Sequence, residues 1–292
     1  MRFSVALAMC PPEHYLPVAR AADESGWGGV AVPDSPFFPE VVEASYHYTA
    51  DGSRYWTGDT PFLDPFVVIP AMAAVTEHVR FLTMVVKLPI RQPLLVAKTV
   101  GSIAALAGPD RMALGVGLSW IPEEFTWLGE DFASRGPRTN EAIGIIRALL
   151  AGGMVEHHGE HYDFDRLQMS PAPAKAVPMI VGGMTAPALR RAARLGDGWV
   201  SANVTTDVLA STINDLRAAL EAEGRADDPF EVIAIATDAF ERDGFKRLAD
   251  LGVTEAITQP WWFYGGDPED LQVRIDAVHR FAETVIQPFS RK

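Results

Sequence analysis

The stretch PMIVGGMTAPALRRAARLGDGWV, residues 178–200, decides the fold. A short apolar run leads through Gly182-Gly183 into a segment with helical spacing that starts near Ala186, and a second apolar run begins at Trp199. A strand, a helix and a second strand in this order form a βαβ unit with parallel strands. The glycine pair permits a tight corner and also leaves backbone N–H groups free before a helix, so on its own it fits a structural turn and an anion-binding turn equally well.

The same alternation continues in both directions from this unit. Eight short apolar runs recur along the 292 residues, at 3–9, 29–33, 80–86, 112–117, 178–182, 199–203, 230–236 and 253–258. Segments with helical spacing separate them, which calls for parallel strands joined by right-handed crossovers. Eight repeats predict an α/β protein with one (β/α)8 TIM barrel in a single domain, residues 1–292. An open doubly wound sheet is the alternative.

Two insertions interrupt the repeat. The first follows the second strand, from Ser35 to Leu63, and is rich in proline, glycine and aromatic residues. It is too long for a plain connection, so we expect a loop over the barrel mouth. The second, from Met154 to Gln168, precedes the fifth strand and alternates around Gly159, which predicts a β-hairpin.

Three histidines in the second insertion are candidate ligands for a metal ion. His157, His158 and His161 lie within five residues, and two of them would share one face of a strand. Gly159 interrupts that strand, however, and favours a hairpin tip. We therefore predict no metal site.

Composition and charge indicate a globular protein and disfavour some kinds of partner. The chain is 48% hydrophobic and 22% charged, as in globular proteins, and its formal net charge of −13 disfavours nucleic acid and anionic membranes as partners. Cys10 is the single cysteine, and neither a signal peptide nor an apolar run long enough to span a membrane is present. The sequence predicts a cytoplasmic protein.

Functional groups of such a barrel gather at the carboxyl ends of the strands. The residues found there include no serine–histidine pair and no metal-ligand spacing, so hydrolysis by those routes has little support. Asp34 paired with Glu123 or Glu124 leaves a glycoside hydrolase as an alternative. The candidates by position are Asp34, residues 83–87, residues 117–120, Gly182-Gly183, Asn203 and residues 259–264.

The chain resembles the luciferase-like flavin and deazaflavin oxidoreductases, the luciferase-like monooxygenase superfamily, from its first strand to its last helix. The motifs that carry the resemblance are ESGWGGVAVPD (24–34), the segment from Pro61 to Leu106, RMALGVGLSWIPEEFTWLG (111–129) and VGGMTAPALRRAARLGDGWV (181–200). The insertion SYHYTADGSRYW followed by DTPFLDP is similar to the branch assigned to coenzyme F420, a deazaflavin, rather than to FMN.

The resemblance implies a cofactor ring at the barrel mouth, against a bulge in the third strand. A non-prolyl cis peptide would lie at Met84-Val85, although many relatives have a small residue in place of Met84. The cofactor-binding residues implied are Asp34, Thr83, Met84, Val85, Ser119, Trp120, Gly182 and Gly183.

Asp34 is the catalytic residue implied by the resemblance. It matches an acidic residue near the ring edge, but Ser35 follows it where some relatives carry a histidine that acts as a base. Asp34 therefore orients the ring or a substrate, or it only satisfies backbone N–H groups of a turn. The expected substrate-binding residues are aromatic or imidazole side chains, which suggest a flat or apolar substrate: His47, Tyr48, Trp56, Trp261, Trp262 and Tyr264.

Basic residues near these positions have two interpretations. Lys87 and Arg91 either help to bind an anionic cofactor or form ion pairs. Arg190, Arg191 and Arg194 follow the glycine pair on one helix and cannot all face a ligand. One of them would meet an anionic tail and the others would be solvated.

The expected activity is hydride transfer between coenzyme F420 and a small organic substrate. The alternatives are an FMN-dependent monooxygenase served by a partner reductase, and a flavin-binding protein without turnover. The resemblance also makes a homodimer plausible.

Overall fold

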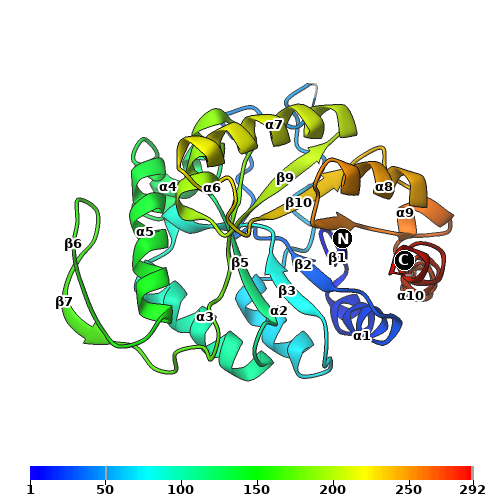
Figure 1. The fold of residues 1–292 in the computed structure, drawn as a ribbon, viewed down its shortest axis with the longest axis horizontal. Helices are drawn as coiled ribbons and strands as arrows, with labels where there is room; N and C mark the ends of the chain where they lie inside the picture. The colour runs from blue at the N-terminus through cyan, green and yellow to red at the C-terminus, as the bar shows by residue number, and fades with distance from the viewer. Residues whose placement is uncertain (50, 291–292) are drawn as a thin grey trace.

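The computed structural model describes residues 1–49 and 51–290, and its centre is a closed barrel of parallel strands (Figure 1). The pairing order β3-β2-β1-β11-β10-β9-β8-β5 is closed by pairing between β3 and β5. The predicted (β/α)8 barrel is confirmed, and the open sheet is excluded. The barrel strands are β1 (Arg2–Ala6), β2 (Gly29–Val32), β3 (Arg80–Thr83) with its short continuation β4 (Val86–Lys87), β5 (Met112–Gly117), β8 (Met179–Gly182), β9 (Gly198–Val204), β10 (Glu231–Ala236) and β11 (Glu255–Thr258).

Helices surround the barrel (Figure 1). Several begin where a side chain caps the first turn: Asp64 accepts from Phe66 N, and Asp270 accepts from Gln272 N. In the described part of the chain, no helix combines the length and the hydropathy that a bilayer crossing requires. The helices are α1 (Tyr15–Ser25), α2 (Pro65–Ala73), α3 (Pro93–Ala107), α4 (Pro122–Trp127), α5 (Arg135–Leu150), α6 (Ala186–Leu195), α7 (Thr206–Ala222), α8 (Arg242–Asp250), α9 (Trp261–Tyr264), α10 (Leu271–Phe281) and α11 (Gln287–Ser290), with single turns at Pro12–His14, Leu88–Ile90 and Ala282–Ile286.

Alternation along each strand separates two cores. Side chains that point outward pack against the helices, and those that point inward fill the barrel. Each of the eight barrel strands contributes one buried side chain to the inner core. These are Ala6, Ala31, Leu82, Ala113, Ile180, Val200, Ile233 and Ile257. The barrel is therefore packed through its middle, which leaves the carboxyl ends of the strands as the place for a site.

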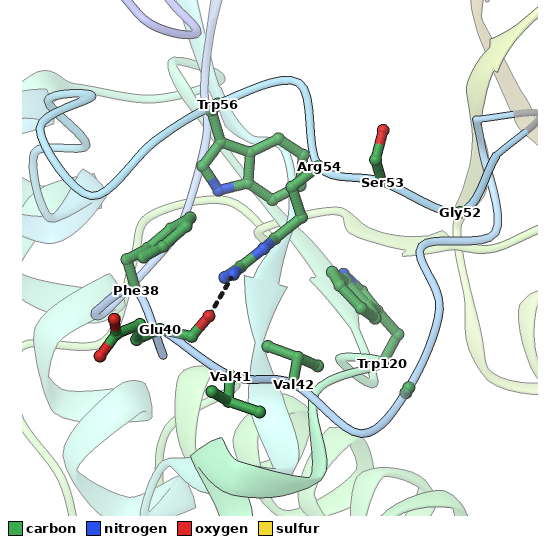
Figure 2. Close-up of a pocket in the computed structure, with 10 residues that line it drawn as sticks. Phe38, Glu40, Val41, Val42, Gly52, Ser53, Arg54, Trp56 and Trp120 are labelled. Atoms are coloured by element: carbon green, nitrogen blue, oxygen red, sulfur yellow. Dashed lines mark hydrogen bonds between the residues drawn. The ribbon is translucent and has the colours of Figure 1, made fainter.

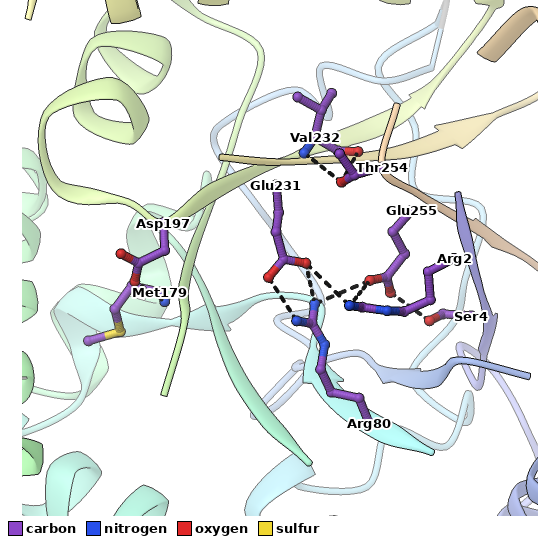
Figure 3. A network of polar contacts seen from close by, with 9 residues as sticks. All are labelled: Arg2, Ser4, Arg80, Met179, Asp197, Glu231, Val232, Thr254 and Glu255. Atoms are coloured by element: carbon purple, nitrogen blue, oxygen red, sulfur yellow. Dashed lines mark hydrogen bonds and ion pairs between the residues drawn. The ribbon is translucent and has the colours of Figure 1, made fainter. Parts of the chain in front are cut away.

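Buried charges close the opposite end of the barrel (Figure 3). Arg80 donates to both carboxylate oxygens of Glu231, at 2.8 and 2.7 Å, and to Glu255 at 3.2 Å. Arg2 also donates to Glu255 at 2.8 Å, and Ser4 Oγ donates to it at 2.5 Å. Burial alone would lower the pKa of Arg80, but the two carboxylates hold it above its ordinary value. Each charge in this cluster thus has a partner of opposite sign.

The two insertions lie where the sequence predicts them. The described residues between β2 and α2 form no helix or strand. The second insertion is an antiparallel hairpin of β6 (Met154–His158) and β7 (Asp163–Gln168), beside α5 in Figure 1. Glu141 on α5 holds it, because its carboxylate bonds His157 Nε2 at 2.8 Å and accepts from Tyr162 N at 2.8 Å.

Candidate active site

The third barrel strand is interrupted at the mouth. A cis peptide bond joins Met84 and Val85, a non-prolyl bond at the position the resemblance implies. Just before it, Thr83 Oγ1 donates to Gly115 O and accepts from Gly115 N, both at 2.8 Å. The Thr83 hydroxyl thus forms the two hydrogen bonds with Gly115 of β5 that a backbone N–H and C=O would form in a regular strand. Thr83 is fully buried, so it supports the bulge from behind.

Three glycines leave room for this bulge. A Cβ on Gly115 would lie 1.9 Å from Thr83 O, and one on Gly117 would lie 2.6 Å from Val85 Cγ2. A Cβ on Gly182 would lie 3.2 Å from Val85 Cγ1. Val85 is only half-buried and packs on the inner core. We call Val85, Gly117 and Gly182 the mouth floor, because the small apolar side chain of Val85 lies here against two positions that carry no side chain.

The second glycine of the pair has a different role. Gly183 has a φ of +121°, in the region that side chains disfavour, and a Cβ there would lie 2.8 Å from Ala188 Cβ. Its carbonyl accepts from the indole Nε1 of the buried Trp199 at 2.7 Å. Gly182 therefore shapes the mouth floor, whereas Gly183 makes the tight corner that leads into α6.

Charged groups at the mouth form one network. The Asp34 carboxylate accepts from the backbone N–H of Lys87 at 2.9 Å and from the Arg91 guanidinium at 2.8 Å. Its side chain is 1% exposed. The ammonium of Lys87 forms an ion pair with Glu124, which is fully buried and also accepts from Ser119 Oγ at 2.6 Å. The network ties the ends of β2, β4 and β5 to α4.

This network bears on several predicted roles. Asp34 holds backbone and guanidinium groups of the neighbouring segment, and its catalytic role stays a prediction. Lys87 and Arg91 form ion pairs, the second of the two interpretations above. From the sequence, Glu124 is a candidate only as a hydrolytic carboxylate, yet in the structure it pairs with Lys87 and accepts from Ser119 Oγ. The sequence does not distinguish it from Glu123, because only the fold shows which of the two side chains points inward.

The first insertion carries an aromatic cluster over the mouth. Tyr46 lies at its centre, with ring centroids 5.0 Å from Trp56, 5.4 Å from Tyr48 and 5.2 Å from Trp120. Burial, and then the nearby Tyr55, raise the pKa of Tyr46 well above its ordinary value, so its hydroxyl stays protonated at neutral pH. Tyr46, at the centre of the cluster, is not among the substrate-binding residues expected from the sequence.

A cavity of about 480 Å³ opens within the insertion (Figure 2). Arg54 joins the later part of the insertion to residues 38–40. Its guanidinium lies 3.6 Å from the centroid of the Phe38 ring and donates to Pro39 O at 2.8 Å and to Glu40 O at 3.2 Å. The lining residues are Phe38, Glu40, Val41, Val42, Ala44, Gly52, Ser53, Arg54, Trp56 and Trp120. Two predicted residues, Trp56 from the insertion and Trp120 from the strand end, thus meet in one cavity.

The other predicted substrate residues do not line this cavity. His47 is exposed, and Tyr48 contacts Tyr46 at its side. Beyond β11, Trp261 is 2% exposed and packs in the core under the Arg274 guanidinium, whereas Trp262 is 60% exposed.

Tyr264, the last residue of that group, also lies away from the cavity. The Arg280 guanidinium lies 4.3 Å from its ring centroid, and its hydroxyl lies 3.3 Å from Thr284 Oγ1. Contact between substrate and the residues after β11 stays a prediction.

The histidines of the hairpin have local partners. His157 pairs with Glu141, and His158 Nδ1 lies 2.5 Å from Asp163 Oδ1. Within residues 1–49 and 51–290, no group of three His, Cys, Asp or Glu side chains is placed to hold a metal ion.

Comparison with known proteins identifies the family. Residues 7–243 match the family model described as luciferase-like monooxygenase, so the chain belongs to that family. An uncharacterized protein of Mycobacterium tuberculosis is 44% identical over 288 residues, covering 98% of this chain and 99% of the relative. An F420-dependent glucose-6-phosphate dehydrogenase of Nakamurella multipartita is 27% identical over 256 residues, which cover 84% of this chain and 69% of the relative.

The fold also matches solved structures. Monooxygenase RslO1 from Streptomyces bottropensis has a TM-score of 0.75 at 19% identity, with 99% of this chain and 100% of that chain covered. The protein is thus an oxidoreductase of the luciferase-like family. Among the proteins that resemble it, the Nakamurella relative is named as F420-dependent, and one structure of similar fold, an oxygenating constituent of 3,6-diketocamphane monooxygenase from Pseudomonas putida, is a complex with FMN.

Proposed function

We propose that the protein transfers a hydride between coenzyme F420 and a small organic substrate that is apolar or aromatic. The observation that carries this proposal is the mouth floor. Val85 lies against Gly117 of β5 and Gly182 of β8, two positions without a side chain, and we expect a planar ring to lie on this small apolar surface. A bound deazaflavin would supply the hydride donor or acceptor.

The residues around the floor have roles that suit this chemistry. Thr83 and the Asp34–Lys87–Glu124 network hold the bulge and the strand ends in place. Tyr46 and the aromatic residues near it exclude water from the space above, and its neutral hydroxyl can donate to a substrate oxygen. The insertion cavity presents the Trp56 and Trp120 rings beside the polar residues Glu40, Ser53 and Arg54, so it offers a substrate both ring contacts and polar groups.

The choice of F420 over FMN rests on two sequence observations. The insertion SYHYTADGSRYW with DTPFLDP resembles the F420 branch, and a relative that matches 84% of this chain carries an F420-dependent activity in its name. The family description as monooxygenases supports the second candidate, an FMN-dependent monooxygenase with a partner reductase.

Cofactor titration tests the proposal. The purified protein is titrated with F420 and with FMN while the fluorescence of each ring is followed. We expect saturable binding of F420 and weaker binding of FMN. Tight FMN binding without a response to F420 would overturn the leading proposal in favour of the monooxygenase.

Turnover is tested separately with reduced and with oxidised F420 against a panel of apolar carbonyl and alcohol substrates. A change in F420 absorbance is expected with at least one of them. Binding without any turnover would favour a flavin-binding protein that does not catalyse a reaction.

A further inference from the structure

A second cavity lies on the outside of the barrel. Its volume is about 220 Å³, and it is lined from α5, α6 and the end of α7 by Asn140, Pro187, Arg190, Arg191, Arg194 and Glu223. Three arginines around one cavity are unusual in a chain whose formal net charge is −13. Glu223 is exposed and forms no ion pair with these arginines in the described residues. We call this the arginine cavity.

Arg191 is the buried member of the set. The residue is 8% exposed, and its Nε donates to Asn140 Oδ1 at 2.7 Å. In the described part of the chain, neither of its terminal amino groups has a hydrogen-bond acceptor or a carboxylate partner. Burial, and then the charges of Arg194 and Arg135, lower the pKa of Arg191. A buried guanidinium without an anion is costly, so this position favours a negatively charged ligand.

The amino end of α5 adds positive charge beside Arg191 in the arginine cavity. Its first turn contains no acidic residue and begins with Arg135, and the Ser134 side chain does not cap it. The amino end of a helix carries a partial positive charge that an acidic residue usually offsets. A Cβ on Gly136 would lie 3.2 Å from Arg191 Nη2, so this glycine leaves space beside the guanidinium.

We propose that the arginine cavity binds the phosphate group of a small molecule, with Arg191 as the buried anchor and Arg190 and Arg194 at the rim. A phosphate presents several oxygens to the planar guanidinium fork and carries the charge needed to neutralise neighbouring arginines. Two sources share this chemistry: the phosphate of the bound cofactor, and a separate phosphorylated ligand. The proposal of a phosphate site rests on the residues that line the arginine cavity, and it does not depend on which cofactor the barrel mouth binds.

The test is calorimetric titration of the protein with inorganic phosphate in a phosphate-free, low-salt buffer without cofactor. Wild type should bind phosphate saturably. Arg191→Met should weaken binding at least about tenfold, because the buried charge-assisted bonds are lost. Arg194→Met should also weaken it, and since Arg194 is exposed this variant keeps the test valid if Arg191→Met does not fold.

Arg20→Met is the matched control. It removes one positive charge from an exposed position on α1 that has no hydrogen-bond or ion-pair partner in the described residues, and it should leave phosphate affinity unchanged. Wild type that shows no saturable binding at millimolar phosphate would overturn the proposal. So would folded Arg191→Met and Arg194→Met variants that bind as well as Arg20→Met.

A competition experiment between phosphate and cofactor distinguishes the phosphate of a bound cofactor from that of a separate ligand. If saturating phosphate weakens F420 or FMN binding in wild type but not in Arg194→Met, the cavity holds the cofactor phosphate. If cofactor affinity does not change while phosphate still binds, the cavity serves a separate phosphorylated ligand. Both results support a phosphate site, and neither depends on the protein turning over a substrate.

Discussion

At the scale of single residues, Glu124 carries a fully buried charge at the barrel mouth. Its carboxylate pairs with Lys87 and accepts from Ser119, and Lys87 is itself largely buried. Glu124→Gln keeps the shape but leaves the Lys87 ammonium without a carboxylate. We expect a loss of about 3–5 kcal/mol in the free energy of unfolding, the usual effect of breaking a buried pair. Urea denaturation measures it.

The control for Glu124→Gln is Glu24→Gln, which changes an exposed carboxylate at the end of α1. Its effect should stay within about 0.5 kcal/mol. Equal effects of the two substitutions would show that the ion pair at the mouth adds no stability.

Gly117 is the residue whose replacement should disturb the mouth floor most directly. Gly117→Ala places a methyl group 2.6 Å from Val85 Cγ2, so Val85 must shift. We expect cofactor affinity to fall by at least about tenfold, in line with a loss of more than 1.4 kcal/mol from a displaced contact. Fluorescence titration measures it.

Gly144→Ala is the matched substitution. It lies in α5, where an added Cβ meets nothing within 4 Å. It should leave cofactor affinity unchanged and raise stability by about 0.5–1 kcal/mol, because alanine favours a helix. If Gly117→Ala binds cofactor as well as Gly144→Ala does, the mouth floor is not the cofactor site.

At the scale of secondary structure, Asp23 joins two elements. From the last turn of α1 its carboxylate accepts from the backbone N–H groups of Glu77, His78 and Val79, at 2.8, 2.7 and 2.7 Å, just before β3. Burial would raise the pKa of Asp23, but these three donors hold it below its ordinary value. The sequence gives no sign of this contact, because the partners are more than fifty positions away.

The sign of the resulting pH effect follows from the lowered pKa. The unfolded chain binds the proton more readily, so the contribution of Asp23 is complete above the unfolded carboxyl pKa of about 4 and is lost as the pH falls through the folded value. Asp23→Asn should cost about 1–3 kcal/mol at pH 7, and the gap to wild type should narrow at acidic pH. Urea unfolding between pH 3 and pH 7, about the range where carboxylates titrate, measures both.

Asp215→Asn, at an exposed position of α7, is the control for this pH dependence. It should track wild type across the whole range. A gap between Asp23→Asn and wild type that does not change with pH would contradict the role assigned to the carboxylate.

At the scale of the whole molecule, the barrel has a closed end and an open end. The Arg80–Glu231–Glu255 cluster closes one end, and the mouth floor lies at the other, with the packed inner core between them. Glu255→Gln should therefore reduce the free energy of unfolding by about 3–5 kcal/mol and leave cofactor affinity unchanged. Urea denaturation and cofactor titration on the same sample check both parts. A parallel loss of affinity in folded protein would mean that the two ends are coupled.

The alternation of strands and helices was predictable from sequence because it depends on local patterns. Apolar runs at eight positions, the proline in the first turn of α6 and the glycine at the hairpin tip each reflect the preference of a few neighbouring residues. Both insertions, the second of which is the hairpin, lie where these patterns place them. Resemblance to a family added the position of the Met84-Val85 bond, which no local pattern indicates.

The sequence by itself thus determined the repeat, the barrel and the strand ends that form the mouth. Only the tertiary structure decided which charged groups meet there: Asp34 with Arg91, Glu124 with Lys87, and Arg191 with no anion. It also placed Trp261 in the core and Trp56 in a cavity wall, although both are tryptophans in segments that follow the carboxyl end of a barrel strand. The physical reason is that burial and pairing depend on which distant segments pack against a side chain, and residue type and spacing do not specify that packing.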